Sequence, residues 1–371
     1  MKQLVCLAVM TLLLSSSVIA KSQVATKHVL DENTDIVLDS SKSWTASRLE
    51  GIHGTGWISD HEIEFVQSVK VGTDEAHEPN YIDTMGNKDI ISGEVSGEKP
   101  GISYDIYAVS PDGRHIYVKQ NHMEDENYFA QHRIISRDGG ETKEIANQAT
   151  AGSAVWLDNE HVLYMGGIGD NGVVQIDLQG KMTPMPALNQ WMVPNKGVQV
   201  SKVGERLYFL VSSRLSYIEL SLMDNPVLHT IFAENVNRFY PSPDGHQIAV
   251  VSTVLGSLSQ SDRMKSELLL LDPDGNPIGD RLETGEYFNK VSWSPDQSKL
   301  TYVVAKHYPD KYEVHVVDMK IVENKMIYKS GNQVAVSEFF WSPNSKLMMF
   351  SVNRSHSTLE SKPETIIYKF N

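Results

Sequence analysis

Hydrophobic and polar residues alternate along most of this chain with the two-residue period of β-strands. The pattern is clearest around residues 291–304, where Val291 and Trp293 alternate with serines, Ser294-Pro295-Asp296 interrupts them, and residues 300–304 are rich in β-formers. Proline sets φ for the first central position of a turn, and aspartate hydrogen-bonds its own backbone at the next. A glycine or asparagine beyond would take the left-handed geometry that closes a hairpin. The stretch therefore predicts a strand, a tight turn and a second strand.

The same unit recurs along the chain. Close copies contain Ser110-Pro111-Asp112, Ser242-Pro243-Asp244 and Ser342-Pro343-Asn344, and degenerate copies are centred near residues 60, 158 and 203. The turn centres of these seven units lie 41 to 52 residues apart, a spacing typical of four-stranded propeller blades. Alternating segments such as 312–318 and 325–329 supply an outer strand pair. We therefore predict an all-β fold, a seven-bladed β-propeller of four-stranded blades.

The Ser-Pro-Asp-Gly sequence, with an aromatic residue before it and a β-rich strand after it, resembles the WD40-like repeat of the TolB-type β-propeller family. The resemblance covers nearly all of the chain after residue 44, and three copies keep Ser-Pro-Asp unbroken. TolB itself carries an α/β domain before its propeller, and no βαβ pattern precedes residue 44 here, so the resemblance concerns the propeller alone. It implies a non-catalytic exported protein that binds a partner in the cell envelope.

The N-terminus reads as a signal peptide over residues 1–20, with Lys2, an apolar run over 4–14 and a small-residue cleavage site at residues 18–20. Cys6 lies inside that segment, so the mature chain contains no cysteine, and neither a disulfide nor a thiol nucleophile is expected. No further apolar run has the length to span a bilayer, so stable membrane insertion is not expected. The predicted location is periplasmic or secreted.

The remaining chain divides into an N-terminal segment, 21–44, and the propeller, 45–371, whose first blade is predicted over 45–97. The last blade ends after residues 365–370, one strand short. We predict that residues 35–39 supply the missing outer strand and close the ring, because closure protects edges that would otherwise aggregate.

Charge and motifs limit the function classes. The formal net charge of −14 makes phosphate backbones poor partners, so nucleic acid is not an expected ligand. The chain has no Gly-x-Ser-x-Gly, His-Glu-x-x-His, phosphate-loop or dinucleotide-binding motif. The predicted function is an exported, non-catalytic, monomeric propeller that binds a protein or polysaccharide and needs no cofactor, although enzymatic activity stays open.

The alternative is a metal-dependent carbohydrate lyase resembling oligogalacturonate lyase, which has a related propeller with a histidine-held metal. A lyase needs a base and a cation that stabilises the resulting anion. Lys306 or Arg354 would be its electrophile. The candidate ligands for a divalent metal are His53, His122, His307 and His356. Scattered surface histidines are the plainer interpretation of these residues.

The working surface is predicted on the face with the loops after each second strand and between blades, because long, dissimilar loops carry function on a rigid scaffold. The partner-binding candidates on that face are Trp191, His77, Glu124, Asp125 and Glu126. By contrast, the tryptophans at the shared repeat position are predicted to be core residues: Trp57, Trp156, Trp293 and Trp341. His61, His115, His161 and His246 lie in or beside the Asp turns and are assigned no role.

Export predicts cleavage after Ala20, because the small side chains before it fit a signal peptidase site. N-terminal sequencing of the envelope-localised protein should begin at Lys21. Recovery of a cytoplasmic protein that retains Met1 would contradict the prediction.

Overall fold

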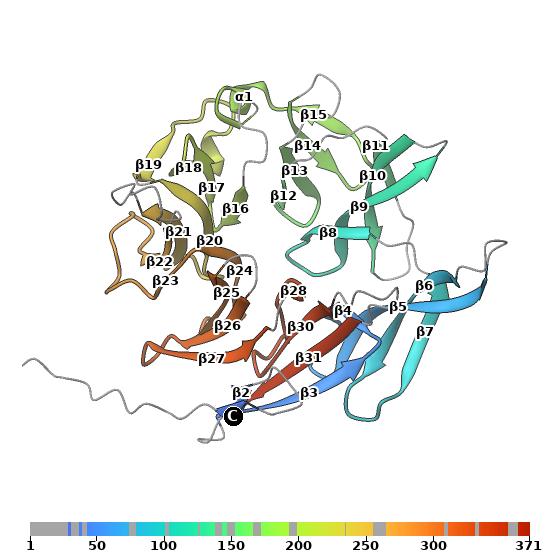
Figure 1. The fold of residues 1–371 in the computed structure, drawn as a ribbon. Coiled ribbons are helices and arrows are strands. Elements are labelled where there is room, and N and C mark those ends of the chain that lie inside the picture. Colours follow the sequence, from blue (N-terminus) through green and yellow to red (C-terminus); the bar gives the residue numbers. More distant parts are fainter. Residues whose placement is uncertain are drawn as a thin grey trace, which may run out of the picture.

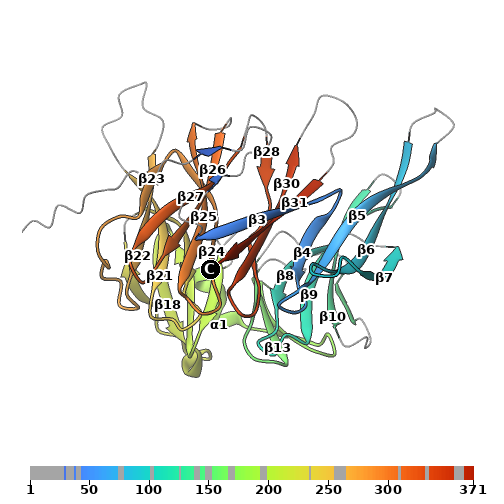
Figure 2. The same ribbon diagram turned by 90° about the horizontal axis from the view of Figure 1, so that it is seen from below.

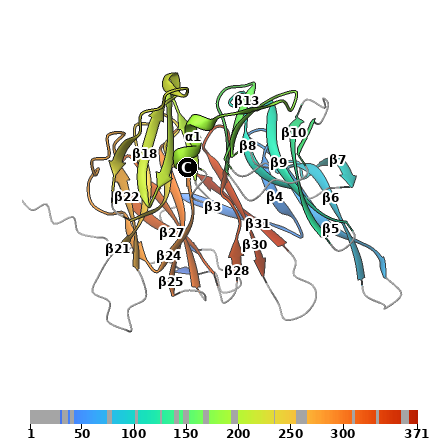
Figure 3. The same cartoon turned by 90° about the horizontal axis from the view of Figure 1, so that it is seen from above.

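The computed structural model describes residues 29–30, 37–38, 43–73, 79–100, 104–124, 127–137, 143–146, 153–165, 172–192, 199–233, 235–254, 265–307, 311–330, 334–354 and 363–371. Seven antiparallel sheets stand in a ring around a central axis (Figure 1). The predicted seven-bladed β-propeller is confirmed. Side views show the strands running between two faces of the ring, with the long β5–β6 hairpin projecting at one side (Figures 2 and 3).

Six blades consist of four consecutive strands, the first of each being innermost (Figure 1). In chain order they are β4–β7 (His53–Trp57, Glu62–Thr73, Pro79–Asp89, Val95–Pro100), β8–β11 (Tyr104–Val109, His115–Glu124, Asn127–Ser136, Lys143–Ala146), β12–β15 (Ser153–Trp156, His161–Met165, Val173–Asp177, Met182–Pro184), β16–β19 (Val200–Val203, Arg206–Val211, Arg214–Glu219, His229–Phe232), β20–β23 (Val236–Pro241, Ile248–Val254, Lys265–Leu271, Glu283–Gly285) and β24–β27 (Tyr287–Trp293, Lys299–His307, Lys311–Asp318, Glu323–Lys329). Blade 1 therefore begins at His53. The start predicted from the sequence was residue 45.

Blade 7 joins the two ends of the chain. It contains β28 (Val334–Val336), β29 (Phe340–Trp341), β30 (Leu347–Arg354), β31 (Pro363–Phe370) and, outermost, β3 (Trp44–Glu50). β3 pairs antiparallel with β31 over seven residues, from Trp44 opposite Phe370 to Glu50 opposite Glu364. A strand from the N-terminal side closes the ring, as predicted.

The prediction that residues 35–39 supply this closing strand was wrong. β31 already has β30 and β3 as neighbours, and β2 (Val37–Leu38) pairs instead with β1 (Val29–Leu30). The physical reason is that the later segment gives a longer ladder and buries more. Trp44 is only 6% exposed and packs into the core between blades 6 and 7. The Arg48 guanidinium also pairs with the Glu364 carboxylate at 2.8 Å.

A buried polar joint connects blade 7 to blade 1. The amide of Gly54 donates to Ser351 Oγ at 3.0 Å and to Thr365 Oγ1 at 2.8 Å, and the Thr365 hydroxyl donates to the Ile52 carbonyl at 2.7 Å. A Cβ at position 54 would lie 2.9 Å from Met349 Sδ, so an alanine there would require the end of the Met349 side chain to move.

The Ser-Pro-Asp turns have one repeated geometry. Ser294 Oγ donates to Asp296 Oδ1 at 2.7 Å and accepts from the Lys299 amide at 2.9 Å, and Ser110, Ser242 and Ser342 make the equivalent pairs. The residue after the aspartate or asparagine has the predicted left-handed backbone. This residue is Gly113 or Gly245 in two blades, but Gln297 (φ 60°) and Ser345 (φ 61°) in two others. The turn therefore forms without glycine when the serine network holds it.

Neighbouring turns also hydrogen-bond to each other. The Asp112 amide donates to Asn159 Oδ1 at 3.0 Å, the Asp296 amide to Ser345 Oγ at 2.9 Å, and the Asn344 amide to Asp60 Oδ1 at 2.8 Å. These bonds connect blade 2 to 3, blade 6 to 7, and blade 7 to 1. They tie several blades together at the end of the ring that carries the turns.

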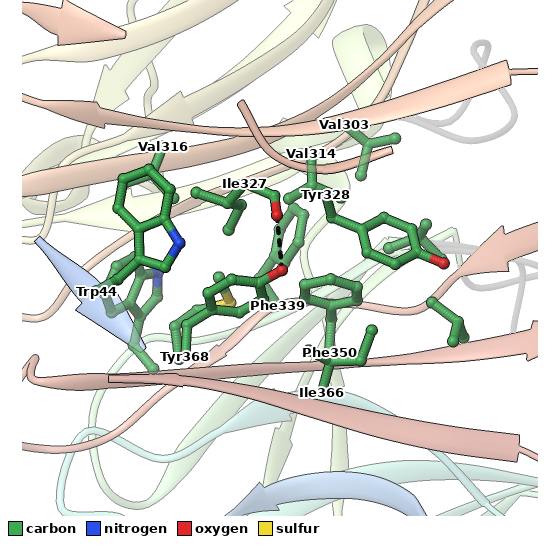
Figure 4. Close-up of a cluster of buried hydrophobic side chains, with 14 of the residues drawn as sticks. Trp44, Val303, Val314, Val316, Ile327, Tyr328, Phe339, Phe350, Ile366 and Tyr368 are labelled. Carbon is green, nitrogen blue, oxygen red and sulfur yellow. Dashed lines mark hydrogen bonds between the residues drawn. The ribbon is translucent and has the colours of Figure 1, made fainter. Parts of the chain in front are cut away.

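The hydrophobic core lies between blades. The largest cluster combines Val303, Val314 and Tyr328 of blade 6 with Phe350 and Tyr368 of blade 7 (Figure 4). In the same figure the Tyr368 hydroxyl donates to the Ile327 carbonyl at 2.8 Å across the interface. The four tryptophans at the shared repeat position are each at most 9% exposed, which confirms their prediction as core residues.

The position of β3 predicts which N-terminal truncation destabilises the ring. Deleting residues 21–50 removes seven ladder pairs and Trp44, and should lower the free energy of unfolding by several kcal/mol, roughly 5 or more. Deleting residues 21–42 leaves β3 in place and is the matched control. Denaturant unfolding with a monomer check by gel filtration measures both. Equal losses in the two truncations would contradict the assignment.

Candidate functional site

The strand order places two sets of turns at the same end of the ring. Strands alternate in direction within each blade, so the turns between first and second strands and between third and fourth strands share one face. We call this end the Asp-turn face, since it carries the Ser-Pro-Asp turns, and the other end the opposite face. All mouth residues discussed below lie at the Asp-turn face.

A hollow of about 520 Å³ occupies the mouth of the central channel on the Asp-turn face. Its wall contains Trp57, Trp293 and Trp341, which end the innermost strands of blades 1, 6 and 7. Its rim contains the turn prolines Pro243, Pro295 and Pro343 together with Val109 and Arg137. A second hollow of about 370 Å³ lies against β16, β20 and β24 and shares Pro243, Ser292 and Trp293 with the first. The mouth is therefore lined mainly by aromatic and proline side chains.

Hydrogen bonds between blades hold the tryptophan wall in place. Trp57 Nε1 donates to the Phe340 carbonyl and Trp293 Nε1 to the Tyr240 carbonyl, both at 2.8 Å, so each indole is bonded to the innermost strand of the preceding blade. Trp341 occupies the same repeat position, but its Nε1 has no hydrogen-bond partner among the described residues. It stacks on Phe370 with ring centroids 5.4 Å apart. The buried tryptophans thus form the wall of the hollow, and the exposed prolines and Val109, which is 42% exposed, offer the contact surface.

Carboxylates surround this apolar mouth. The Ser110 hydroxyl and the Arg114 amide donate to Asp112 and lower its pKa. Burial opposes ionisation of Asp244 and Asp296, but the serine hydroxyls and turn amides that donate to them leave the pKa of both below its usual value. These groups are therefore ionised at neutral pH. The exposed Arg137 guanidinium on the rim forms no ion pair with any residue the structure describes.

Little of the predicted metal site falls within the described side chains. His53 begins β4 on the opposite face, where burial lowers its pKa and favours the neutral imidazole. His122 and His307 lie on β9 and β25, but their side chains are outside the described residues, as is all of His356. Within the described part of the chain, no group of three or more His, Cys, Asp or Glu side chains could hold a metal ion. The four histidines stay a prediction.

Most partner-binding candidates also lie outside the described residues. These are His77, Asp125 and Glu126, while Glu124 is placed only as the last residue of β9. Trp191 is described and lies in α1 (Pro186–Met192), between β15 and β16. It is partly buried against the core shared by blades 3 and 4, and Asn189 of the same helix accepts a hydrogen bond from the Val173 amide at 2.9 Å. Trp191 thus covers the end of an interblade core.

The hollow lies on the face to which the sequence assigned no function. Each mouth residue has a local explanation, since the prolines form turns and the tryptophans fill the core. A signal was nevertheless present: a residue at the same position in every blade must lie in a ring around the channel.

Among the described residues, no helix has the length and hydropathy needed to cross a bilayer.

Comparison with solved structures gives the fold. An oligogalacturonate lyase in complex with manganese matches with a TM-score of 0.57 and 14% identity, over 93% of this chain and 96% of that one. The Cps50 (Swd1) β-propeller domain of Myceliophteria thermophila matches with a TM-score of 0.51 and 11% identity, over 88% and 98%. A prolyl endopeptidase matches with 0.51 and 13%, over 85% of this chain but only 48% of its own, so this chain spans about half its length. No protein-family model and no curated protein matches the chain. The chain shares the β-propeller fold of these proteins.

Trp293 and Trp341 occupy the same repeat position, but among the described residues only the Trp293 indole has a hydrogen-bond partner. They therefore form a matched pair for substitution. Trp293→Phe leaves the partly buried Tyr240 carbonyl without its indole donor, whereas Trp341→Phe removes no hydrogen bond to any described residue. Trp293→Phe should therefore lower the free energy of unfolding by about 2 kcal/mol more than Trp341→Phe. Urea unfolding of both variants measures the difference. Equal losses would show that the indole donor contributes nothing to joining blades 5 and 6.

Proposed function

We propose that this chain is a non-catalytic β-propeller, exported to the periplasm or secreted, that binds a protein or polymer partner in the manner of TolB-type propellers. The observation that carries the proposal is the aromatic and proline-lined hollow at the channel mouth. Large aromatic side chains in a concave, apolar site with a polar rim are typical of binding surfaces.

The rigidity of the mouth supports binding without rearrangement. Interblade bonds fix Trp57 and Trp293, and the serine networks fix the turns that carry Pro243 and Pro295. A preformed site avoids the entropic cost of ordering loops when a partner arrives. Each apolar group that a partner places in the hollow then contributes roughly 25 cal/mol per Å² of surface removed from water.

The proposal predicts that charge in the mouth abolishes partner capture. Val109→Asp combined with Pro295→Asp places two carboxylates on exposed positions of the rim, where a bound apolar group would have to desolvate them. Capture from an envelope extract should fall at least about ten-fold, which corresponds to about 1.4 kcal/mol. Circular dichroism melting should show a loss of at most about 1 kcal/mol, because both positions are exposed and the serine network still holds the turn that loses Pro295.

Two control variants act on the opposite face. Tyr287→Asp alters an exposed aromatic residue at the start of β24. A second control combines His53→Ala, His122→Ala, His307→Ala and Trp191→Ala, the set predicted from the sequence. Loss of capture only in these controls would show that the working surface is the opposite face. Full capture by the mouth variant would remove the support for the proposal.

The likeness to an oligogalacturonate lyase over 93% of the chain favours one second candidate, a metal-dependent carbohydrate lyase. His53, His122, His307 and His356 would hold the metal. This candidate predicts stoichiometric divalent metal in the purified protein, its loss on replacing the four histidines with alanine, and release of unsaturated product from oligogalacturonate. Elemental analysis and ultraviolet absorbance measure these outcomes. A protein that takes up no metal and releases no product when Mn²⁺ is supplied rejects the candidate.

A further inference from the structure

We propose that the whole Asp-turn face is a docking surface, and that its occupant is a protein surface which presents Lys or Arg side chains around apolar ones. This inference rests on the proposed function and adds to it the extent of the surface and the chemistry of the partner. The hollow at the channel mouth is then the centre of a wider contact area.

Exposed apolar side chains on the Asp-turn face are the first observation that supports a docking surface. Eight large hydrophobic residues on the described part of the Asp-turn face are exposed. Val109 is on the rim of the hollow. The most exposed ones occupy turns between third and fourth strands: Ile91 in blade 1 (82%), Val227 in blade 4 (52%), and Ile321 (57%) and Val322 (61%) in blade 6. These turns surround the hollow from three sides of the ring.

Blade 1 connects the hollow to the outer turns. Ile58 directly follows Trp57 of the hollow and is 46% exposed. Its turn lies beside the turn of Ile91, because the Ile90 amide donates to the His61 carbonyl at 2.8 Å. Two adjacent turns at the end of blade 1 therefore each carry an exposed isoleucine, and one of these turns directly follows the hollow. Exposed apolar residues grouped beside an apolar hollow are typical of an interaction site, whereas single scattered ones are not.

The turn chemistry determines the charge of the surface. Asp89 accepts hydrogen bonds from the Ile91 and Ser92 amides, both at 2.8 Å, and Asp318 accepts one from the Lys320 amide at 2.9 Å. The two amides that hold Asp89 lower its pKa, so it is ionised next to the most exposed isoleucine. Asp224 is two residues from Leu222 in blade 4, and Glu94 directly precedes Val95 in blade 1. Most of the exposed apolar residues thus have an acidic residue within two or three positions in the chain.

These carboxylates select the partner. A surface that covers Ile58, Ile91 and Val322 removes water from the neighbouring acids, which is unfavourable unless cations replace that water. Acidic protein surfaces, anionic lipid and nucleic acid would be repelled. A basic protein surface with apolar side chains satisfies both requirements. Electrostatic attraction would speed its association, and salt would weaken it.

Site-specific photocrosslinking in the cells that make the full-length protein tests the proposal. A photoreactive side chain replaces Ile91 or Ile321 on the docking surface, or Tyr287 on the opposite face as the matched control. Mass spectrometry then identifies the linked partner segment. The two docking positions should crosslink a protein at least roughly five-fold more than Tyr287, and the linked segment should carry excess Lys and Arg beside apolar residues.

A charge reversal provides the second arm. Glu94→Lys on the Ile91 probe should lower its crosslink yield several-fold, whereas Glu94→Gln should lower it less, because only the first adds repulsion. The Glu94 side chain is exposed and receives no hydrogen bond from any described residue, so the fold should tolerate both changes.

Three outcomes would overturn the inference. Crosslinks from Tyr287 alone would place the partner on the opposite face; partner binding would still stand, but the mouth hollow would no longer be its site. Crosslinks from Ile91 to an acidic segment, or to a polysaccharide, would show that the chemistry of the partner is wrong. The absence of crosslinks at every position, together with failed capture from envelope extract, would overturn the proposed function as well.

Discussion

Packing between neighbouring blades is the interaction on which the rest of this structure depends. No four-stranded sheet here buries both of its faces by itself, and each core cluster combines side chains from two adjacent blades. Such a chain gains its stability from interfaces between neighbours, so an open ring would leave two sheet faces unburied. The Gly54 joint, the Trp44 contact and the seven-residue ladder between β3 and β31 are all concentrated where the ring closes.

Local patterns were sufficient to predict the fold, since each Ser-Pro-Asp turn and its flanking strands repeat at blade spacing. The same patterns could not identify the closing strand, because residues 36–38 are strong β-formers and lie close in the chain to residues 44–50, whose strand pattern is weaker. The difference between them is a tertiary one. Trp44 fits the interface between blades 6 and 7, and Arg48 meets Glu364, a residue more than three hundred positions away. Neither contact could be predicted from the sequence pattern of residues 44–50 alone.

The candidate site was hidden for a related reason. Pro243, Pro295 and Pro343 each have a complete explanation as turn residues, and Trp293 as a core residue. Only the ring arrangement brings them to one opening. The histidines were predicted as site residues because long, dissimilar loops often carry function, but most of those side chains lie outside the described residues. The same turn residues serve the fold and set the charge of the surface. Asp112 and Asp296 accept the hydrogen bonds that a tight turn needs, and their carboxylates add negative charge to the Asp-turn face.

Ring closure also has a consequence in time. β3 ends at residue 50, whereas its partner β31 begins at residue 363 and is therefore made more than three hundred residues later. During synthesis Trp44 and the edge of β3 have no native partner until the segment that contains β31 is present. Long-range pairing of this kind slows folding and leaves an exposed β-edge and an indole available to holding chaperones. The synthesis of β31 therefore determines when β3 can take its native place in the ring.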